Sequence, residues 1–260
     1  MLRAFSTAAT GMTGQQTMVD VIANNLANVN TSGFKRSQLN FQDLLYVTLE
    51  EAGTEIASGI NSPSGIEIGS GVRVASTVKV HSAGELQNTA NPLDIAIAGE
   101  GFLQISLPNG DLRYTRDGSL QVNANRELVT ATGYTLVPSI TIPADSTVSI
   151  EKDGGVNITD ATGNQSVVGT IQLARFANPS GLSSEGGNLL AETAASGTPT
   201  TGTAGDNGFG TIQSGFLEKS NVQMVTELVN LITAQRAYEI NSKAITVGDE
   251  MLQTANSIVR

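Results

Sequence analysis

Cysteine is absent from this sequence of 260 residues, and histidine occurs once, as His81. The chain therefore cannot form a disulfide, a thiolate metal site or a Cys–His nucleophilic pair. A lone histidine just past a predicted strand is typical of a surface or packing residue rather than a zinc ligand. We predict no catalytic residue, no metal ligand and no cofactor site, and the sequence favours a protein that is not an enzyme.

Basic side chains and long apolar runs are also scarce. Lys and Arg number 14 against 24 for Asp and Glu, which gives a net charge of −10. Nucleic acid is excluded as a partner because phosphate binding requires a basic surface. No run is long enough to cross a bilayer, so we expect no membrane insertion. The N-terminal stretch "MLRAFSTAATGMTGQQ" interrupts its apolar residues with polar ones, so we expect no cleaved secretory signal.

Both ends of the chain carry seven-residue apolar repeats. At the N-terminal end the repeat consists of Phe5, Met12, Val19 and Leu26, followed three residues later in each case by Ala8, Gln15, Ile22 and Val29. At the C-terminal end it consists of Met224, Leu231, Tyr238, Ile245, Leu252 and Val259, with the small residues Ala234, Gly248 and Ala255 in the complementary position. These repeats predict two long helices with a coiled-coil-like seam.

The middle of the chain alternates with a period of two. The run "VRVASTVKV" (72–80) and the runs "LDIAIA", "FLQISL" and "VSIEKDGGVNI" predict antiparallel strands, and "PNGD", "RDG" and "KDGG" predict the turns. Segments 50–65 and 192–208 fit neither period and are expected to be extensions or long loops.

The predicted fold class is therefore α+β, with long N- and C-terminal helices, a central antiparallel all-β module and an extended hairpin or loop region. The expected domains are a helical domain (1–34 plus 217–260), an extended connecting region (35–71 plus 190–216) and a β module (72–189).

The outer face of the first predicted helix is almost free of charge. Across residues 1–34 the only charged side chains are those of Arg3 and Asp20. One interpretation is an unusual amphipathic helix packed on its own domain. The other is that this face meets further copies of the chain, because amides and hydroxyls are buried at lower cost than charges. On the second interpretation, the assembly interface consists of Phe5, Met12, Val19, Ile22, Leu26, Asn24, Asn25, Asn28, Met224, Leu231, Tyr238, Ile245 and Leu252.

The second predicted helix differs because three charged residues, Arg236, Lys243 and Glu250, share one of its stripes. This stripe is either a solvated face or, if the helices assemble in a ring, a lining of an aqueous centre. These three residues are the channel-facing candidates.

Three long motifs resemble the rod and hook proteins of the bacterial flagellum. They are "ANNLANVNTSGFKRSQLNFQDLL" near the N-terminus, "GEGFLQI" with "LRYTRDGSLQVNANRELVTATGYTLVP" in the middle, and "GFLEKSNVQMVTELVNLITAQRAYEINSKAI" near the C-terminus. The resemblance implies export through the flagellar type III channel without signal cleavage. It also implies polymerisation into a hollow helical shaft, with the terminal helices forming the inner tube and the β module outside. In "ANRELV", the residues Asn125, Arg126 and Glu127 stand where the family pattern leads us to expect a glycine.

Within this family, the length and the run "GIEIGSGVRVASTVKVHSAGELQNTANPLDIAI" are most similar to subunits of the distal rod, which crosses the periplasm as a drive shaft in the basal body. A proximal rod or hook-type subunit is the alternative, and a β-rich binding module with helical oligomerisation ends is the alternative of a different class. The partners implied are other copies of the chain, proximal rod proteins, hook protein, basal-body ring proteins and the flagellar export apparatus. We expect segment 46–65 to brace neighbouring subunits and to stiffen the polymer.

Overall fold

The computed structural model of the chain describes residues 2–53, 55–57, 60–61, 63–144, 146–160 and 163–258. It contains two compact units. The helix–ribbon unit comprises residues 1–26, 37–78 and 223–260, and the β unit comprises residues 27–36 and 79–222. The predicted α+β class is confirmed, since two long helices flank a middle part that is rich in antiparallel strands.

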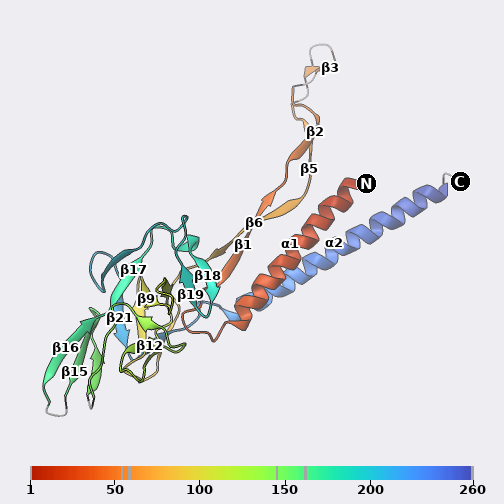
Figure 1. Cartoon of the computed structure of the whole chain (residues 1–260). Helices are drawn as coiled ribbons and strands as arrows, with labels where there is room; N and C mark the ends of the chain where they lie inside the picture. Colours follow the sequence, from red (N-terminus) through yellow and green to blue (C-terminus); the bar gives the residue numbers. More distant parts are fainter. Residues whose placement is uncertain are drawn as a thin grey trace. The chain divides into compact units, whose positions relative to one another are not determined.

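The helix–ribbon unit contains helix α1 (Leu2–Ala27) and helix α2 (Met224–Ile258), as the seven-residue repeats predicted. The helices run antiparallel (Figure 1). Small residues let them approach closely: a methyl group on Gly248 would lie 2.6 Å from Cε1 of Phe5, and one on Gly11 would lie 2.9 Å from Nδ2 of Asn241. A larger side chain at Gly248 or Gly11 would have to displace the side chain of Phe5 or Asn241.

A two-stranded ribbon completes the helix–ribbon unit (Figure 1). It is built from three nested antiparallel pairs: β1 (Ser37–Asp43) with β6 (Val72–Lys79), β2 (Tyr46–Glu50) with β5 (Ile66–Gly69), and β3 (Glu55–Ala57) with β4 (Ile60–Asn61). Of the two sequence-based alternatives for this region, the extended hairpin is correct. Apart from β6, the ribbon strands show no clear period-two pattern, because neither face of the ribbon is fully buried. Residues 54, 58, 59 and 62 of the segment 46–65 lie outside the described residues.

The β unit is built around a nine-stranded sheet. Its strands are β9 (Phe102–Ser106), β10 (Leu112–Thr115), β11 (Leu120–Val122), β12 (Leu128–Thr130), β13 (Thr135–Leu136), β17 (Gln172–Arg175), β18 (Ser183–Gly186), β19 (Leu189–Ala191) and β20 (Thr200–Thr203). A three-stranded sheet consists of β14 (Thr147–Ile150), β15 (Gly155–Thr159) and β16 (Gln165–Thr170). Two further pairs join β8 (Ile95–Ala98) to β21 (Thr211–Ser214) and β7 (Leu86–Asn88) to β22 (Phe216–Glu218), and a short 3₁₀ helix, η1, spans Pro179–Gly181.

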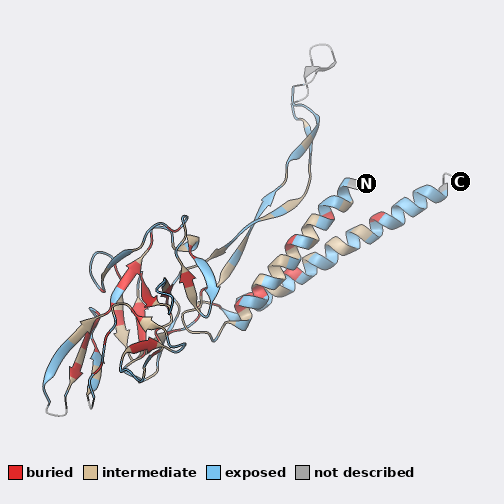
Figure 2. Ribbon diagram, in the orientation of Figure 1, coloured by how far each residue is buried: buried red, intermediate tan, exposed pale blue. Residues whose placement is uncertain are grey.

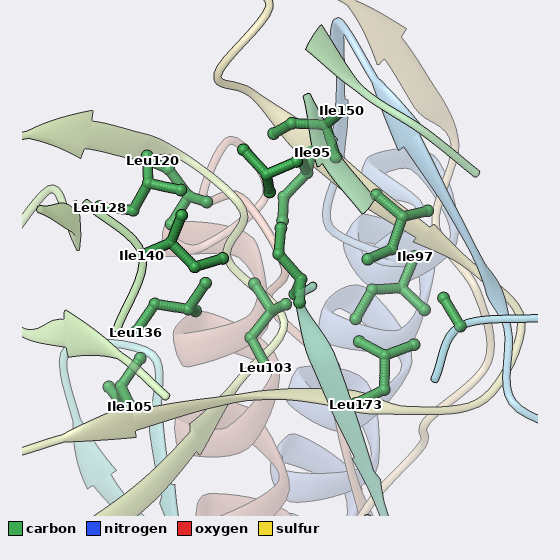
Figure 3. Close-up of a cluster of buried hydrophobic side chains, with 14 of the residues drawn as sticks. Ile95, Ile97, Leu103, Ile105, Leu120, Leu128, Leu136, Ile140, Ile150 and Leu173 are labelled. Carbon is green, nitrogen blue, oxygen red and sulfur yellow. The ribbon is translucent and has the colours of Figure 1, made fainter. Parts of the chain in front are cut away.

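Strand β9 shows how the alternation in "FLQISL" builds the core. Leu103 and Ile105 point into the main apolar cluster, which also contains Leu120, Leu136 and Leu173 (Figure 3). Phe102, one residue out of phase, joins a second cluster with Tyr114, Ala174, Phe176, Leu182 and Leu190. Both faces of this strand are therefore covered, which fixes its register.

Two local expectations need correction or completion. Segment 192–208 is not a loop throughout, because β20 pairs with β17 and Ala204 is 3% exposed in the main cluster. Its Thr-rich sequence has little apolar surface, but a strand at a sheet edge can pair through its backbone without burying apolar side chains. In the turn between β11 and β12, Arg126 takes φ of 64°, the left-handed conformation for which a glycine was expected. The amide and carbonyl of Asn123 close this turn onto Glu127 and Arg126.

Candidate assembly surfaces

The contact between α1 and α2 within the chain is made by small side chains. Ala8 and Ile22 of α1 are buried, and so are Ala234 and Gly248 of α2, which stand two heptads apart. Two of the three small residues predicted in the complementary position therefore pack inside the chain, whereas the third, Ala255, is exposed. Because these side chains contribute little apolar area, this contact is a thin one.

The large apolar residues of the predicted interface are left partly or fully accessible. On α2, Met224, Tyr238 and Leu252 are 49%, 44% and 38% exposed, while Leu231 and Ile245 are half-buried. On α1 the residues at intermediate exposure are Phe5, Met12, Val19 and Leu26, whereas Ile22 is buried. Val259 lies outside the described residues.

Helix α2 is apolar on more than one side. Exposed aliphatic side chains also occur outside the ladder, at Val225, Val229, Ile232, Ile240 and Val247. Much of the helix is coloured as exposed in Figure 2. A helix that is apolar around much of its circumference is typical of one surrounded by other protein. A scattered exposed leucine would need no explanation, but a continuous set along one helix indicates an interaction surface.

The polar side chains on the helices are already hydrogen-bonded within the chain. The hydroxyls of Thr10, Thr13 and Thr17 donate to carbonyls three or four residues earlier in α1, and those of Thr233 and Thr254 do so in α2. Such a face is polar yet carries no unsatisfied donor from these hydroxyls. It is therefore suited to burial against another helix.

The three asparagines of the predicted interface have different surroundings. Asn25 is 1% exposed and exchanges two hydrogen bonds with the backbone of Ser37, at 2.9 and 2.8 Å. Its amide therefore serves the subunit's own fold by fastening the start of β1 to α1. Asn24 is exposed, and Asn28 is half-buried and accepts a hydrogen bond from Thr31 at 3.1 Å. Of the three, Asn24 and Asn28 remain in the interface that we propose below.

The channel-facing candidates Arg236, Lys243 and Glu250 are all exposed on one stripe of α2. Arg236 forms an ion pair with Glu239 at 2.9 Å, and both side chains are more than half exposed. An exposed pair of this kind contributes little to stability. The stripe is thus a hydrated surface in the isolated chain.

The ribbon also exposes apolar side chains. They include Leu45, which is 89% exposed, together with Phe41, Tyr46, Leu49, Ile66 and Ile68. Next to them, an open groove of about 780 Å³ within the helix–ribbon unit is lined by residues of α1 and α2 and by Ile68.

A buried cluster of charges in the β unit was not predicted from the sequence. Glu218 accepts hydrogen bonds from Lys35 Nζ at 2.5 Å, from the Gly84 amide at 2.8 Å and from Arg116 at 3.2 Å. The side chains of Lys35, Arg116 and Glu218 are at most 6% exposed. Burial tends to raise the pKa of Glu218, but Arg116, Lys35 and Gly84 outweigh it and hold that pKa below its usual value. Burial lowers the pKa of Lys35, against the pull of Glu218.

This charge cluster joins the segment that follows α1 to the segment that precedes α2. The amide of Gly33 donates to the carbonyl of Glu218 at 2.8 Å. Gly33 has φ of 67°, and a Cβ there would lie 2.6 Å from the backbone of Arg116, so both conformation and space require glycine. Lys35, Arg116 and Glu218 are too far apart in the sequence for any motif to reveal them.

His81 stands beside this cluster. It is half-buried and packs edge-on against Phe102 at 5.6 Å, so the packing role expected from the sequence is confirmed. Burial, followed by the charges of Lys35, Arg116 and Lys79, lowers its pKa to about 4. Its imidazole is therefore neutral at neutral pH.

Neither helix has the length and apolar character needed to span a membrane, as far as the described residues extend. Within the same residues, no group of His, Cys, Asp and Glu side chains is arranged to hold a metal ion.

Comparisons with known proteins identify the family. Three family models match the chain: "Flagella basal body rod protein" over residues 5–35, "Flagellar hook protein FlgE/F/G D1 domain" over 96–158, and "Flagellar basal body rod FlgEFG protein C-terminal" over 213–258. The first match covers most of α1, the second lies in the β unit and the third covers α2.

Relatives of known name match the chain along nearly its whole length. The flagellar basal-body rod protein FlgG of Borreliella burgdorferi is 46% identical, covering 100% of both chains. The proteins of the same name from two Buchnera aphidicola subspecies are 48% identical, covering 97% of this chain and 98% of the relative, and 46% identical, covering 99% and 100%. With this identity and coverage, the chain belongs to the family of flagellar basal-body rod proteins.

Proposed function

We propose that this chain is the structural subunit of the distal part of the flagellar rod, and that it polymerises into a hollow helical shaft. The observation that carries the proposal is the apolar circumference of α2, where Met224, Tyr238 and Leu252 remain exposed after α1 has packed. Burying a fully exposed side chain of this kind contributes roughly 1.5 to 3 kcal/mol, and covering the exposed part of each of these three contributes a share of that amount. Repeated along 35 residues of helix, this gain stabilises a polymer.

In the proposed shaft the two helices form an inner tube. The large apolar ladders, with Asn24 and Asn28, meet neighbouring copies, while the stripe of Arg236, Lys243 and Glu250 faces a water-filled channel. A charged stripe on an otherwise apolar helix fits this arrangement because charges are costly to bury. The shaft would transmit torque and provide the passage for exported subunits.

The other partners in this proposal are proximal rod proteins, hook protein, basal-body ring proteins and the flagellar export apparatus. The names of the relatives support assembly in the basal body. A subunit of the proximal rod or of the hook type, within the same family, is the alternative assignment.

The test is a pair of matched leucine substitutions. Leu252 on α2 is 38% exposed and Leu112 in the β unit is 44% exposed, so Leu252→Asp and Leu112→Asp should perturb the monomer equally little. We expect Leu252→Asp to abolish filament formation, measured by electron microscopy, because a carboxylate would be desolvated in the interface. We expect Leu112→Asp to leave assembly intact. Normal filaments from Leu252→Asp would overturn the proposed inner tube.

We further propose that the ribbon braces neighbouring subunits. Leu45 and Leu49 are 89% and 57% exposed, and a contact between them and a neighbouring subunit would resist the sliding that bends a shaft. Removal of residues 50–62, or the double change Leu45→Ser with Leu49→Ser, should still allow filaments but make them curved. Filament curvature in electron micrographs is the measurement, and straight filaments from both variants would contradict the bracing role.

A further inference from the structure

A small cavity in the β unit reaches the buried charge cluster. It measures about 30 Å³, room for roughly two water-sized groups. Its lining includes Lys35, Lys79, His81, Arg116 and Asn188. Lys35 and Arg116 are buried, whereas Lys79, His81 and Asn188 are half-buried, so the cavity runs inward from the surface.

Positive charge exceeds negative charge around this cavity. Lys35 and Arg116 share the carboxylate of Glu218. Lys79 forms no ion pair with any described residue, and its Nζ lies 5.9 Å from the centre of the Phe34 ring. Beside the rim, Asp117 accepts hydrogen bonds from Ser119 at 2.9 Å and from Asn188 at 3.4 Å. Three cations thus stand against two carboxylates, and one positive charge remains.

Polar atoms at this cavity also lack partners. Nε of Arg116 is buried without a hydrogen bond to any described residue. The ring nitrogens of His81 make no hydrogen bond of ordinary geometry within the described residues, and the imidazole has only an interaction with the backbone of Pro179. The Arg116 side chain is 6% exposed, so this donor lies inside the fold. Buried donors are nearly always satisfied in stable proteins, which indicates that something with acceptor atoms occupies this space.

We propose that the cavity receives a carboxylate side chain, Asp or Glu, from a neighbouring copy of this chain. One carboxylate oxygen would accept from Arg116 Nε, and the other would accept from Lys79 or from the N–H of His81. The bound carboxylate would cancel the excess positive charge. Acidic residues outnumber basic ones in this chain, so a second copy presents the required group in abundance. The inference rests on the proposed polymer.

The single histidine makes the monomer test simple. His81 gives the only imidazole signals of the chain in NMR spectra. The probe is sodium acetate, compared with sodium chloride at equal ionic strength. We expect a saturable shift of the His81 signals with acetate alone, and a higher pKa of His81, because a nearby anion favours the imidazolium.

A pair of lysine variants locates the binding site. Lys79→Gln should weaken acetate binding on the order of threefold to fivefold, as for a partly exposed charge. The control is Lys152→Gln, which removes an exposed lysine away from the cavity lining and should leave acetate binding unchanged. Equal shifts with acetate and chloride, or equal losses in the two variants, would overturn a carboxylate site.

The polymer test separates a docked side chain from a free anion. Solid-state NMR of assembled wild-type protein should show the His81 signals displaced in the direction that acetate produces, with no acetate present. If acetate binds the monomer but the His81 signals of the polymer equal those of the free monomer, the cavity holds an adventitious ion only and the inference fails. If the chain forms no polymer, the proposed function itself fails.

Discussion

The two units of this molecule differ in how far their apolar side chains are buried. In the β unit, residues such as Ile105, Leu128 and Leu136 are completely buried. In the helix–ribbon unit, the buried apolar residues with a described environment are Ala8, Ile22 and Ala234, while Leu45, Val225 and Ile240 are largely exposed (Figure 2). The β unit has a core of its own, whereas the helix–ribbon unit leaves most of its large apolar side chains accessible, as the proposed polymer interface requires.

Breaking the buried charge cluster should have the largest effect on the β unit. Glu218→Gln leaves Lys35 and Arg116 buried without a countercharge, so we expect the free energy of unfolding to fall by roughly 3 to 5 kcal/mol. The control is Glu185→Gln, which removes the partly exposed partner of Arg113 and should cost about 1 kcal/mol or less. Urea unfolding followed by circular dichroism measures both. Similar midpoints would show that the cluster contributes no more than a surface pair.

A matched pair of isoleucines compares the two units directly. Ile105→Ala removes a fully buried side chain and should lower the free energy of unfolding by about 2 to 5 kcal/mol. Ile240→Ala, at a site that is 68% exposed, should change monomer stability by about 0.5 kcal/mol or less, yet weaken filament assembly. Urea unfolding and a sedimentation assay of filaments give the two readouts. Unimpaired assembly of Ile240→Ala would remove that face of α2 from the interface.

Acid should weaken the β unit through His81. The unfolded histidine has a pKa of about 6.5, and burial among Lys35, Arg116 and Lys79 lowers it to about 4 in the fold. As the pH falls from 6.5 toward 4, His81 becomes protonated in the unfolded chain but stays neutral in the folded chain. The free energy of unfolding therefore decreases in that window, by up to about 3 kcal/mol.

The measurement is urea unfolding at several pH values, and His81→Gln should flatten the dependence above pH 5. The depressed pKa of Glu218 adds its own loss only below the usual glutamate range, so it does not mask this window. A variant as acid-sensitive as wild type down to pH 5 would contradict the role of His81.

The smallest predicted effect is in the turn between β11 and β12. Arg126→Gly removes the strain of a left-handed residue and should stabilise the β unit by about 0.5 to 1 kcal/mol. Asn125 has no positive φ among the backbone conformations described, so Asn125→Gly should give no gain. Thermal unfolding of the two variants separates them, and a gain at Asn125 alone would show that strain at Arg126 is negligible.

The sequence predicted what depends on local periodicity. Seven-residue repeats marked α1 and α2, and alternation marked β6, β8, β9 and the β14–β15 hairpin, because each of these patterns lies within a single run of the sequence. The rest of the ribbon and β20 were harder to predict, since exposed pairing requires no apolar alternation. The repeats did not show which residues of α2 pack inside the chain. Ala234 and Gly248 do so and Leu252 does not, because this depends on how closely the two helices approach in the folded structure. The charge cluster joins residues that are distant in sequence and resemble surface charges.

The charge cluster also bears on the order in which the chain folds. Helices α1 and α2 come from opposite ends of the chain, and bringing such distant segments together carries a large loop-closure entropy. Lys35 and Glu218, which are 183 residues apart, already meet inside the β unit, a few residues from where each helix begins or ends. Once the β unit has folded, only a short closure remains before the helices can pair. A subunit with a misfolded β unit would thus pair its helices slowly, and the proposed polymer would incorporate it more slowly than a correctly folded one.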